Sequence, residues 1–180
     1  MIQKLMDRGS QIAAVAVALV LLGMIPATAL SQQRDSTALA RERDIRERVD
    51  YINRQLMTYP APTKLGRYQI DLLPGGKLTI DGRVGESALG HREAYIEDIG
   101  SIHTNIESRE PPYTTTLFVC RTGDCFVVTN GLDIVGTSDR GGFDFAFDRR
   151  LARQIENAAE ELLSLAMVDS RYGPPHSRRD

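Results

Sequence analysis

Apolar and polar residues alternate, with a period of two, in short segments through the middle of the chain. The segments 68–72 and 78–80 alternate on either side of a Pro-Gly-Gly sequence at 74–76, and three phenylalanines alternate with other residues at 143–147. This period places successive side chains on opposite faces of a strand, and proline and glycine mark the turn between two strands. The pattern predicts an antiparallel hairpin at 68–80 and a core strand at 143–147.

Weaker patterns complete the expected sheet. The segments 94–96 and 101–106 are short strand-like stretches separated by a polar turn. The segments 83–92 and 131–142 are polar and contain glycine, which is typical of loops. Together with a pair of strands around the two cysteines, these segments bring the expected number to about seven strands.

That pair of strands surrounds the polar loop RTGD at 121–124. Aromatic and β-branched residues on both sides of such a loop predict an antiparallel hairpin, in which Cys120 lies opposite Cys125 and Phe118 lies opposite Val127. Directly opposed residues have Cα atoms about 4.5–5.5 Å apart, a separation that a disulfide spans. We therefore expect a disulfide between Cys120 and Cys125 at the tip of this hairpin.

Two other roles for the cysteine pair are less well supported. A redox-active pair usually has two residues between its cysteines and opens a helix. Four residues separate Cys120 from Cys125, and both flanks are strand-like. A zinc site needs four ligands, and no histidine cluster accompanies this segment. A structural disulfide is the favoured interpretation, with redox and metal roles as alternatives.

Residues 36–59 repeat apolar side chains with the period of a helix. Ile45, Val49, Ile52 and Leu56 follow one another at intervals of four, three and four positions and form one stripe, whereas the opposite face is charged. Such a stripe packs either on the domain of its own chain or on a partner or second copy. It is the candidate partner-docking face of the chain.

A second amphipathic helix is expected at 149–167, with Asp148 as its N-cap. It directly follows the phenylalanine strand, so strand and helix should share one core. The side chains expected to contribute most to that core are Phe118, Phe126, Phe143, Phe145, Phe147, Leu151, Ile155 and Leu162.

The first 29 residues have the features of an export signal. Lys4 and Arg8 precede an uncharged apolar run at 12–25, and the ATA sequence at 27–29 predicts cleavage after Ala29. An uncleaved membrane anchor is the alternative, although this run is shorter than the roughly 20 residues that a membrane span needs. We expect a periplasmic or secreted protein, in a compartment where disulfides form.

These features divide the chain into five parts. They are a signal peptide (1–29), a polar leader with the first helix (30–59), a proline-containing linker (60–66), a β domain with its C-terminal helix (67–168) and a disordered tail (169–180). The composition, 42% hydrophobic and 26% charged, fits one globular domain with extensions. A formal net charge of −2 gives no bulk attraction to nucleic acid or anionic lipid.

The order of elements over 68–167 resembles the pleckstrin-homology-like superfold. The resemblance rests on about seven strands, the cysteine-containing hairpin, and a phenylalanine strand that runs directly into a helix (FDFAFDRRLARQIENAAEELLSLA). It implies an α+β fold, a bent antiparallel β-sandwich or barrel capped by a C-terminal α-helix, here with an amphipathic helix before it.

The resemblance also bears on ligands. Members that bind phosphoinositides carry a Lys and Arg cluster in the loop between the first two strands, but the loop at 73–77 contains only Lys77. We therefore expect no specific site for a lipid headgroup. What the resemblance implies is a scaffold that binds peptides or proteins along a strand edge, and the strands at 94–106 offer such an edge.

Catalytic and metal-binding constellations are weak in this sequence. The segment GESALG at 85–90 lacks the glycine that a nucleophile elbow has two residues after its serine, here Ser87. His91 and Glu93 offer two metal ligands without a third, and His103 stands alone. We expect no catalytic residue, metal or cofactor.

The sequence thus favours a non-catalytic binding or assembly module of the bacterial envelope, whose partner is an envelope protein or a second copy of the chain. The alternative is a small periplasmic enzyme or small-ligand-binding protein. An enzyme should gather at least two of four side chains in a closed pocket, namely Ser87, His91, Glu93 and His103.

Overall fold

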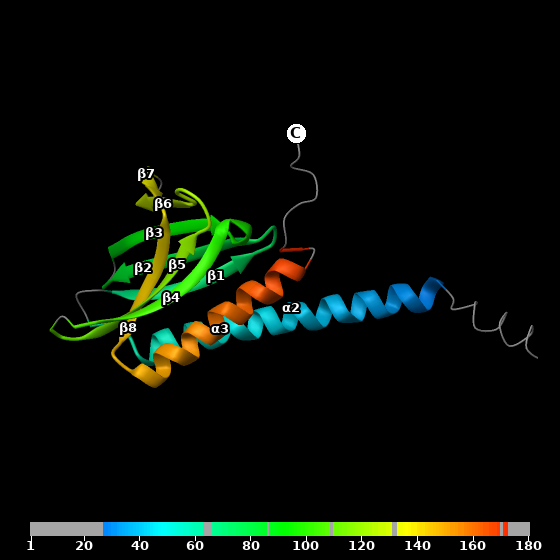
Figure 1. The fold of residues 1–180 in the computed structure, drawn as a ribbon, viewed down its shortest axis with the longest axis horizontal. Helices are drawn as coiled ribbons and strands as arrows, with labels where there is room; N and C mark the ends of the chain where they lie inside the picture. Colours follow the sequence, from blue (N-terminus) through cyan, green and yellow to red (C-terminus); the bar gives the residue numbers. More distant parts are fainter. Residues whose placement is uncertain are drawn as a thin grey trace, which may run out of the picture. The chain divides into compact units, whose positions relative to one another are not determined.

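The structure is a computed structural model that describes residues 27–62, 66–85, 87–108, 110–130, 133–169 and 171–172, with only the backbone described over 27–35 (Figure 1). The chain divides into two units, Met1–Ala40 and Arg41–Asp180. The apolar run of the expected signal peptide and the last eight residues of the expected tail lie outside the described residues.

The described residues form an α+β fold with two α-helices and eight strands that pair antiparallel. In chain order the elements are α2 (Ala27–Thr58), β1 (Arg67–Leu73), β2 (Lys77–Val84), β3 (Ser87–Tyr95), a 3₁₀ turn (Ile96–Asp98), β4 (Ile99–Glu107), β5 (Tyr113–Cys120), β6 (Phe126–Asn130), β7 (Asp133–Ser138), β8 (Arg140–Ala146) and α3 (Arg149–Val168). No helix among them is long and apolar enough to cross a membrane.

The strands form two separate sheets rather than a closed barrel, so the barrel form of the expected fold is wrong. One sheet has the order β1-β2-β3-β6-β7 and the other has the order β4-β5-β8. Each sheet therefore keeps two edge strands. Figure 1 shows α3 beside the C-terminal half of α2, along the sheets. An ion pair of 2.6 Å joins Arg48 of α2 to Glu161 of α3.

Two of the eight strands lie where loops were expected. Strand β3 covers much of the segment 83–92, and β7 lies inside the segment 131–142. The side chains of β7 are largely exposed, and those of β3 pass from exposed to half-buried along the strand, so neither strand shows the alternation that burial of one face produces. Backbone hydrogen bonds to β2 hold β3, and backbone hydrogen bonds to β6 hold β7. Such bonds cannot be predicted from the pattern of side chains.

The expected hairpin between the two cysteine-flanked runs is also wrong. Strand β5 pairs with β4 and β8, whereas β6 pairs with β3 and β7 in the other sheet. In the predicted register Phe118 and Phe126 would point to opposite faces of one hairpin. Both side chains are fully buried in the same core, which the chain achieves by passing from one sheet to the other between them.

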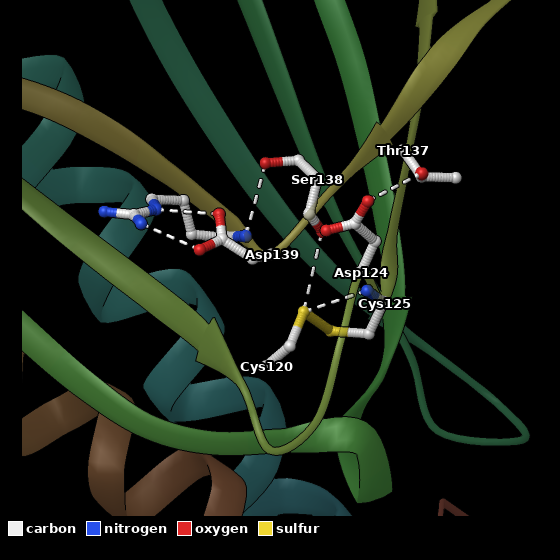
Figure 2. The surroundings of a disulfide bond; sticks show 7 residues. Cys120, Asp124, Cys125, Thr137, Ser138 and Asp139 are labelled. Atoms are coloured by element: carbon white, nitrogen blue, oxygen red, sulfur yellow. Dashed lines mark hydrogen bonds and ion pairs between the residues drawn. A yellow bond between two sulfur atoms is a disulfide. The ribbon is translucent and has the colours of Figure 1, made fainter.

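The expected disulfide is present and spans this change of sheet (Figure 2). The Cys120–Cys125 bond has an S–S distance of 2.08 Å and a Cα–Cα distance of 5.7 Å. The backbone N–H of Cys120 donates to the carbonyl of Asp139 at 2.8 Å, and the hydroxyl of Thr137 donates to Asp124 at 3.1 Å. The disulfide corner is thereby tied to the turn between β7 and β8.

The core follows the sequence expectation except at Phe147. Phe118, Phe143 and Phe145 are buried, with neighbouring ring centroids 6.1 and 6.3 Å apart. Phe147 is 45% exposed because β8 ends at Ala146, before the alternation would turn this side chain inward. Asp148 then caps α3 as expected, since its carboxylate accepts from the N–H groups of Arg150 and Leu151.

The apolar stripe of the first helix lies in the core. Ile45, Val49, Ile52 and Leu56 are buried in the same cluster as the sheet and α3 residues. The alternative stated above, in which this helix packs on its own domain, is therefore the arrangement in the structure. Residues 41–58 belong to one compact unit with the strands, and the stripe is covered by the chain itself.

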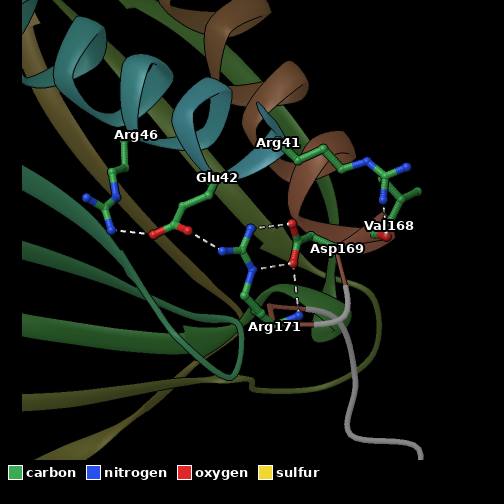
Figure 3. A network of polar contacts seen from close by, with 6 residues as sticks. All are labelled: Arg41, Glu42, Arg46, Val168, Asp169 and Arg171. Atoms are coloured by element: carbon green, nitrogen blue, oxygen red, sulfur yellow. Dashed lines mark hydrogen bonds and ion pairs between the residues drawn. The ribbon is translucent and has the colours of Figure 1, made fainter. Parts of the chain in front are cut away.

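The segment just after α3 is ordered by polar contacts, although disorder was expected from residue 169 onward. Asp169 is buried and accepts from the backbone N–H and the guanidinium of Arg171, and Arg171 also pairs with Glu42 of α2 (Figure 3). The N–H of Gly75 donates to the carbonyl of Arg171 at 2.7 Å. We call Glu42, Asp169 and Arg171 the tail latch, because they connect α2, the end of α3 and the β1–β2 turn.

Candidate functional site

Four edge strands bound the two sheets, and they differ in how their outward backbone groups are satisfied. Strands β1 and β7 are the edges of the larger sheet, and β4 and β8 are the edges of the smaller one. An edge strand has unpaired N–H and C=O groups that either meet a covering element or remain available to another chain. The covering elements therefore indicate where a partner could add.

Strands β1 and β8 are closed by the chain that precedes them. The side-chain amide of Asn53 in α2 donates to the carbonyl of Ile70 at 2.8 Å and accepts from its N–H at 2.9 Å, so it occupies the β1 edge. The N–H of Ala146 donates to the carbonyl of Tyr59 at 3.0 Å, and Pro60 forms a bridge with Phe145. Neither edge can add a further strand at these positions.

Strand β4 is open along most of its outer edge. The carboxylate of Glu156 accepts from the N–H of Thr104 at 3.2 Å, and the N–H of Ile99, at the start of the strand, donates to the carbonyl of Ile96. No other described group outside β5 hydrogen bonds to the β4 backbone. Alternate residues of an antiparallel strand direct their backbone groups away from the partner, so those of Ile106 point outward with those of Thr104. The Ile106 side chain is 42% exposed.

A groove runs between this edge and α3. It has a volume of about 350 Å³ and is lined by Thr104, Ile106, Arg149, Ala152, Arg153 and Glu156. We call it the β4–α3 groove. A second hollow on the same helix shares Arg149 and Arg153 and is also lined by Arg150, Gln154 and Asn157. The two hollows together extend the surface from the sheet edge across the first turns of α3.

The arginines of this surface form no ion pair within the described part of the chain. Arg149, Arg150 and Arg153 are exposed, and no ion pair joins any of them to a residue that the structure describes. The first turn of α3 also contains no acidic side chain. The β4–α3 groove therefore has two arginines and one carboxylate in its lining, a net positive charge, and the carboxylate of Glu156 is engaged by the N–H of Thr104.

Strand β7 is open too, but it is less regular. Ile134 and Val135 are 71% and 62% exposed, and no described group hydrogen bonds to the outer edge of the backbone between residues 133 and 137. The pairing with β6 shifts at this point, since Val128 lies opposite Gly136 and Thr129 lies opposite Ile134. Such a bulge interrupts the even spacing of an edge and disfavours the addition of another strand.

A separate pocket opens between the two sheets. It has a volume of about 260 Å³ and is lined by Tyr68, Arg92, Thr115, Leu117, Ser138, Arg140, Gly141, Gly142 and Asp144. We call it the inter-sheet pocket. Its carboxylate is held in place, because Asp144 accepts from the hydroxyl of Thr115 at 2.6 Å and from the phenol of Tyr68 at 3.3 Å. Burial and the nearby Asp144 charge raise the pKa of Tyr68 to about 12, so this phenol stays a neutral donor.

The titratable side chains noted in the sequence do not form a closed site. His91 lies 2.9 Å from Asp81 and 3.6 Å from Glu93 on the surface of β2 and β3. The ammonium of Lys77 pairs with Glu93 at 3.0 Å and lowers the pKa of that carboxyl. Within the described ranges, no group of three His, Cys, Asp or Glu side chains is arranged to hold a metal ion.

The other two candidates lie apart from this cluster. Ser87 is exposed at the start of β3. His103 is exposed on β4, where its Nε2 lies 3.1 Å from the hydroxyl of Ser101. The structure thus brings together His91 and Glu93 alone among the four, and it does so on an open surface.

Sequence reasoning pointed to the region of the β4 edge but missed both cavities. The arginines of α3 were visible as a basic start of a helix, although nothing in the sequence places them beside an edge strand. The inter-sheet pocket left no sequence signal, because Tyr68, Arg92 and Asp144 come from three strands far apart in the chain. Comparison with protein-family models, curated proteins and solved structures found no match to this chain.

Proposed function

We propose that this protein is a non-catalytic binding module of the bacterial envelope that recognises an extended, acidic segment of a partner protein. The observation that carries the proposal is the open β4 edge, whose outward backbone groups lie beside the β4–α3 groove. An added strand satisfies such groups and places alternate side chains toward the neighbouring surface.

The charge of the groove defines the partner. Arg149 and Arg153 line it without acidic partners in the described chain. Guanidinium groups pair with carboxylates through two parallel hydrogen bonds, which gives orientation as well as affinity. A segment with Asp or Glu at alternate positions presents these carboxylates to α3 while its backbone pairs with β4. A second copy of the chain remains a competing occupant.

The pleckstrin-homology-like architecture is part of this proposal. Two antiparallel sheets followed by a C-terminal helix agree with it in element order, and the proposed use of a strand edge beside that helix suits such a scaffold. Lipid headgroup binding is not proposed, because Lys77 is engaged by Glu93 rather than grouped with other basic residues.

Export to the periplasm or the cell exterior is the second part of the proposal. It rests on the basic and apolar character of residues 1–29, and the Cys120–Cys125 disulfide is compatible with it. N-terminal sequencing of the exported protein should give a mature chain that begins at Leu30. A mature chain that still begins at Met1 would favour a membrane-tethered form.

The binding proposal is tested with fluorescent decapeptides of alternating Glu and Thr and with matched peptides of Lys and Thr, by fluorescence anisotropy. The acidic peptide should bind, and a double Arg149→Glu and Arg153→Glu variant should lose at least about tenfold in affinity, since each guanidinium contact to a carboxylate is worth roughly 1.5–3 kcal/mol. The control, Arg67→Glu with Arg83→Glu, makes the same charge change at exposed positions on β1 and β2.

A pair of substitutions at one residue separates backbone pairing from charge. Ile106→Pro removes an outward N–H of the edge strand without removing a ladder hydrogen bond, whereas Ile106→Ala keeps that N–H. Strand addition predicts that the proline variant binds the acidic peptide more weakly than the alanine variant. Equal binding by the two variants, with both folded by circular dichroism, would exclude pairing at β4. Size-exclusion chromatography over a range of concentrations tests the second copy as occupant.

A further inference from the structure

The inter-sheet pocket contains two opposite charges that are not paired with each other. Arg92 of β3 and Asp144 of β8 both line it, and no ion pair joins them. Arg92 is partly buried, and its guanidinium has no hydrogen bond or ion pair with any residue that the structure describes. A partly buried guanidinium with unused donors favours an anionic group as its partner.

The other charges in the pocket are already neutralised. Arg140 also lines the pocket, but its guanidinium makes two hydrogen bonds, of 2.9 and 2.7 Å, to the carboxylate of Asp139. Arg92 and Asp144 therefore remain as one positive and one negative group. A ligand that carries a single charge would pair with one of these two groups and leave the other without an ionic partner.

Asp144 is prepared to accept from a ligand. Thr115 and Tyr68 each donate one hydrogen bond to it, one to each carboxylate oxygen. A carboxylate offers about four lone-pair sites, so about two remain for further donors. The two existing bonds also fix the orientation of the carboxylate before any ligand arrives, which lowers the entropy lost on binding.

The size of the pocket limits the ligand. The pocket has a volume of about 260 Å³. This is below the usual range for drug-sized ligands, which begins at about 300 Å³. Leu117 supplies an apolar wall, while Gly141 and Gly142 contribute no side chains. The pocket suits a molecule with two charged ends and a short side chain.

From this arrangement we propose that the inter-sheet pocket binds a small zwitterion of the α-amino acid class, with its carboxylate on Arg92 and its ammonium group on Asp144. The proposal is independent of peptide binding at the β4–α3 groove, because the two sites share no lining residue. It specifies a ligand class for the alternative function, that of a small-ligand-binding protein.

Isothermal titration calorimetry with the twenty L-amino acids, acetate and ethylamine tests the proposal on the full mature chain. At least one amino acid should bind more tightly than acetate or ethylamine, because each of these carries one of the two charges. Arg92→Gln and Asp144→Asn should each weaken that binding by about tenfold or more, as expected for the loss of a charged hydrogen-bond partner.

Matched controls distinguish the site from the general charge of the surface. Arg83→Gln and Asp98→Asn make the same changes at exposed positions outside the pocket and should leave the affinity unchanged. Circular dichroism confirms that each variant is folded, and Tyr68→Phe provides a variant that keeps both charges. The proposal is overturned if no amino acid binds more tightly than both singly charged probes, or if Arg92→Gln binds as the parent does.

Discussion

Two edges of the sheets are covered by the end of α2 and the segment after it, and the two others are not. Strands β1 and β8 are met by Asn53, Tyr59 and Pro60, which all belong to the end of α2 and the segment after it. Among the described residues, the β4 edge is met by Glu156 of α3 at Thr104, and no group meets the β7 edge between residues 133 and 137. One segment of chain thus closes an edge of each sheet, and the opposite edges remain available for binding.

The open edges also differ from each other, and the difference favours β4 over β7 as the binding surface. Strand β4 borders a groove lined by Arg149, Arg153 and Glu156, whereas β7 is interrupted by a bulge and carries two exposed aliphatic side chains. We expect the closed edges to govern stability and the β4 edge to govern binding.

The largest effect should come from the buried part of β8. Phe145→Ala removes a fully buried ring next to the bridge with Pro60 and should lower the free energy of unfolding by about 3–5 kcal/mol. Phe147→Ala is the matched control, because the same change at an exposed side chain should cost less than about 1 kcal/mol. Urea denaturation measures both, and equal losses would contradict the placement of these two rings.

Breaking the closed β1 edge should have the next largest effect. Asn53→Leu keeps the size of the side chain but leaves the N–H and C=O of Ile70 without their partner. At this partly buried site each unsatisfied group should cost about 1–2 kcal/mol, the lower part of the usual range, so the two together should lower the free energy of unfolding by about 2–4 kcal/mol. Arg54→Ala, an exposed neighbour on α2, should change it by less than about 0.5 kcal/mol. A similar value for both variants would mean that the edge is not closed by Asn53.

Removing the disulfide should loosen the open side of the molecule. A double Cys120→Ser and Cys125→Ser variant loses the constraint on a short loop, which corresponds to about 2 kcal/mol in the chain-entropy model. Hydrogen exchange should then increase in β6 and β7 more than in α2, because the disulfide corner is bonded to the β7–β8 turn. A uniform increase over the whole chain would argue against a local role.

Acid should weaken the tail latch. Hydrogen bonds from Arg171 lower the pKa of Asp169 and of Glu42. Both carboxyls therefore bind protons more readily in the unfolded chain, where they titrate near pH 4. The stability they contribute is fully present above that range and is lost as the pH falls from it through the lower pKa values of the folded protein.

The test of the latch is the slope of stability against pH. Arg171→Met should give a free energy of unfolding that falls less steeply than that of the parent as the pH drops from about 5 to about 3. Arg67→Met, at an exposed position that forms no ion pair with a described residue, should keep the parent slope. Parallel curves for all three proteins would show that the latch does not titrate with folding.

The smallest effect on stability should come from the open β7 edge. Ile134→Lys and Val135→Lys change exposed side chains and should alter the free energy of unfolding by less than about 0.5 kcal/mol. They should also leave binding of the acidic peptide intact, in contrast to Ile106→Pro. Loss of peptide binding in the β7 variants would indicate that the peptide binds at β7 rather than at β4.

The sequence by itself determined the local features of this protein. The spacing of Cys120 and Cys125, the Asp148 cap, the apolar face of α3 and the burial of Phe143 and Phe145 follow from residues that are close in the chain. The stripe of α2 could also be predicted as apolar. These features depend on periodicity, capping and short loops, which are properties of a single segment.

The tertiary structure decided how the segments meet. Strands β3 and β7 exist because partner strands bind their backbones, and β5 and β6 separate because Phe118 and Phe126 both enter one core. The core that buries the α2 stripe, and the pairing of Asn53 with β1, depend on contacts between distant segments. The β4 edge stays open for the same reason, since which elements cover a strand depends on where the whole chain places them, and no local pattern contains that information.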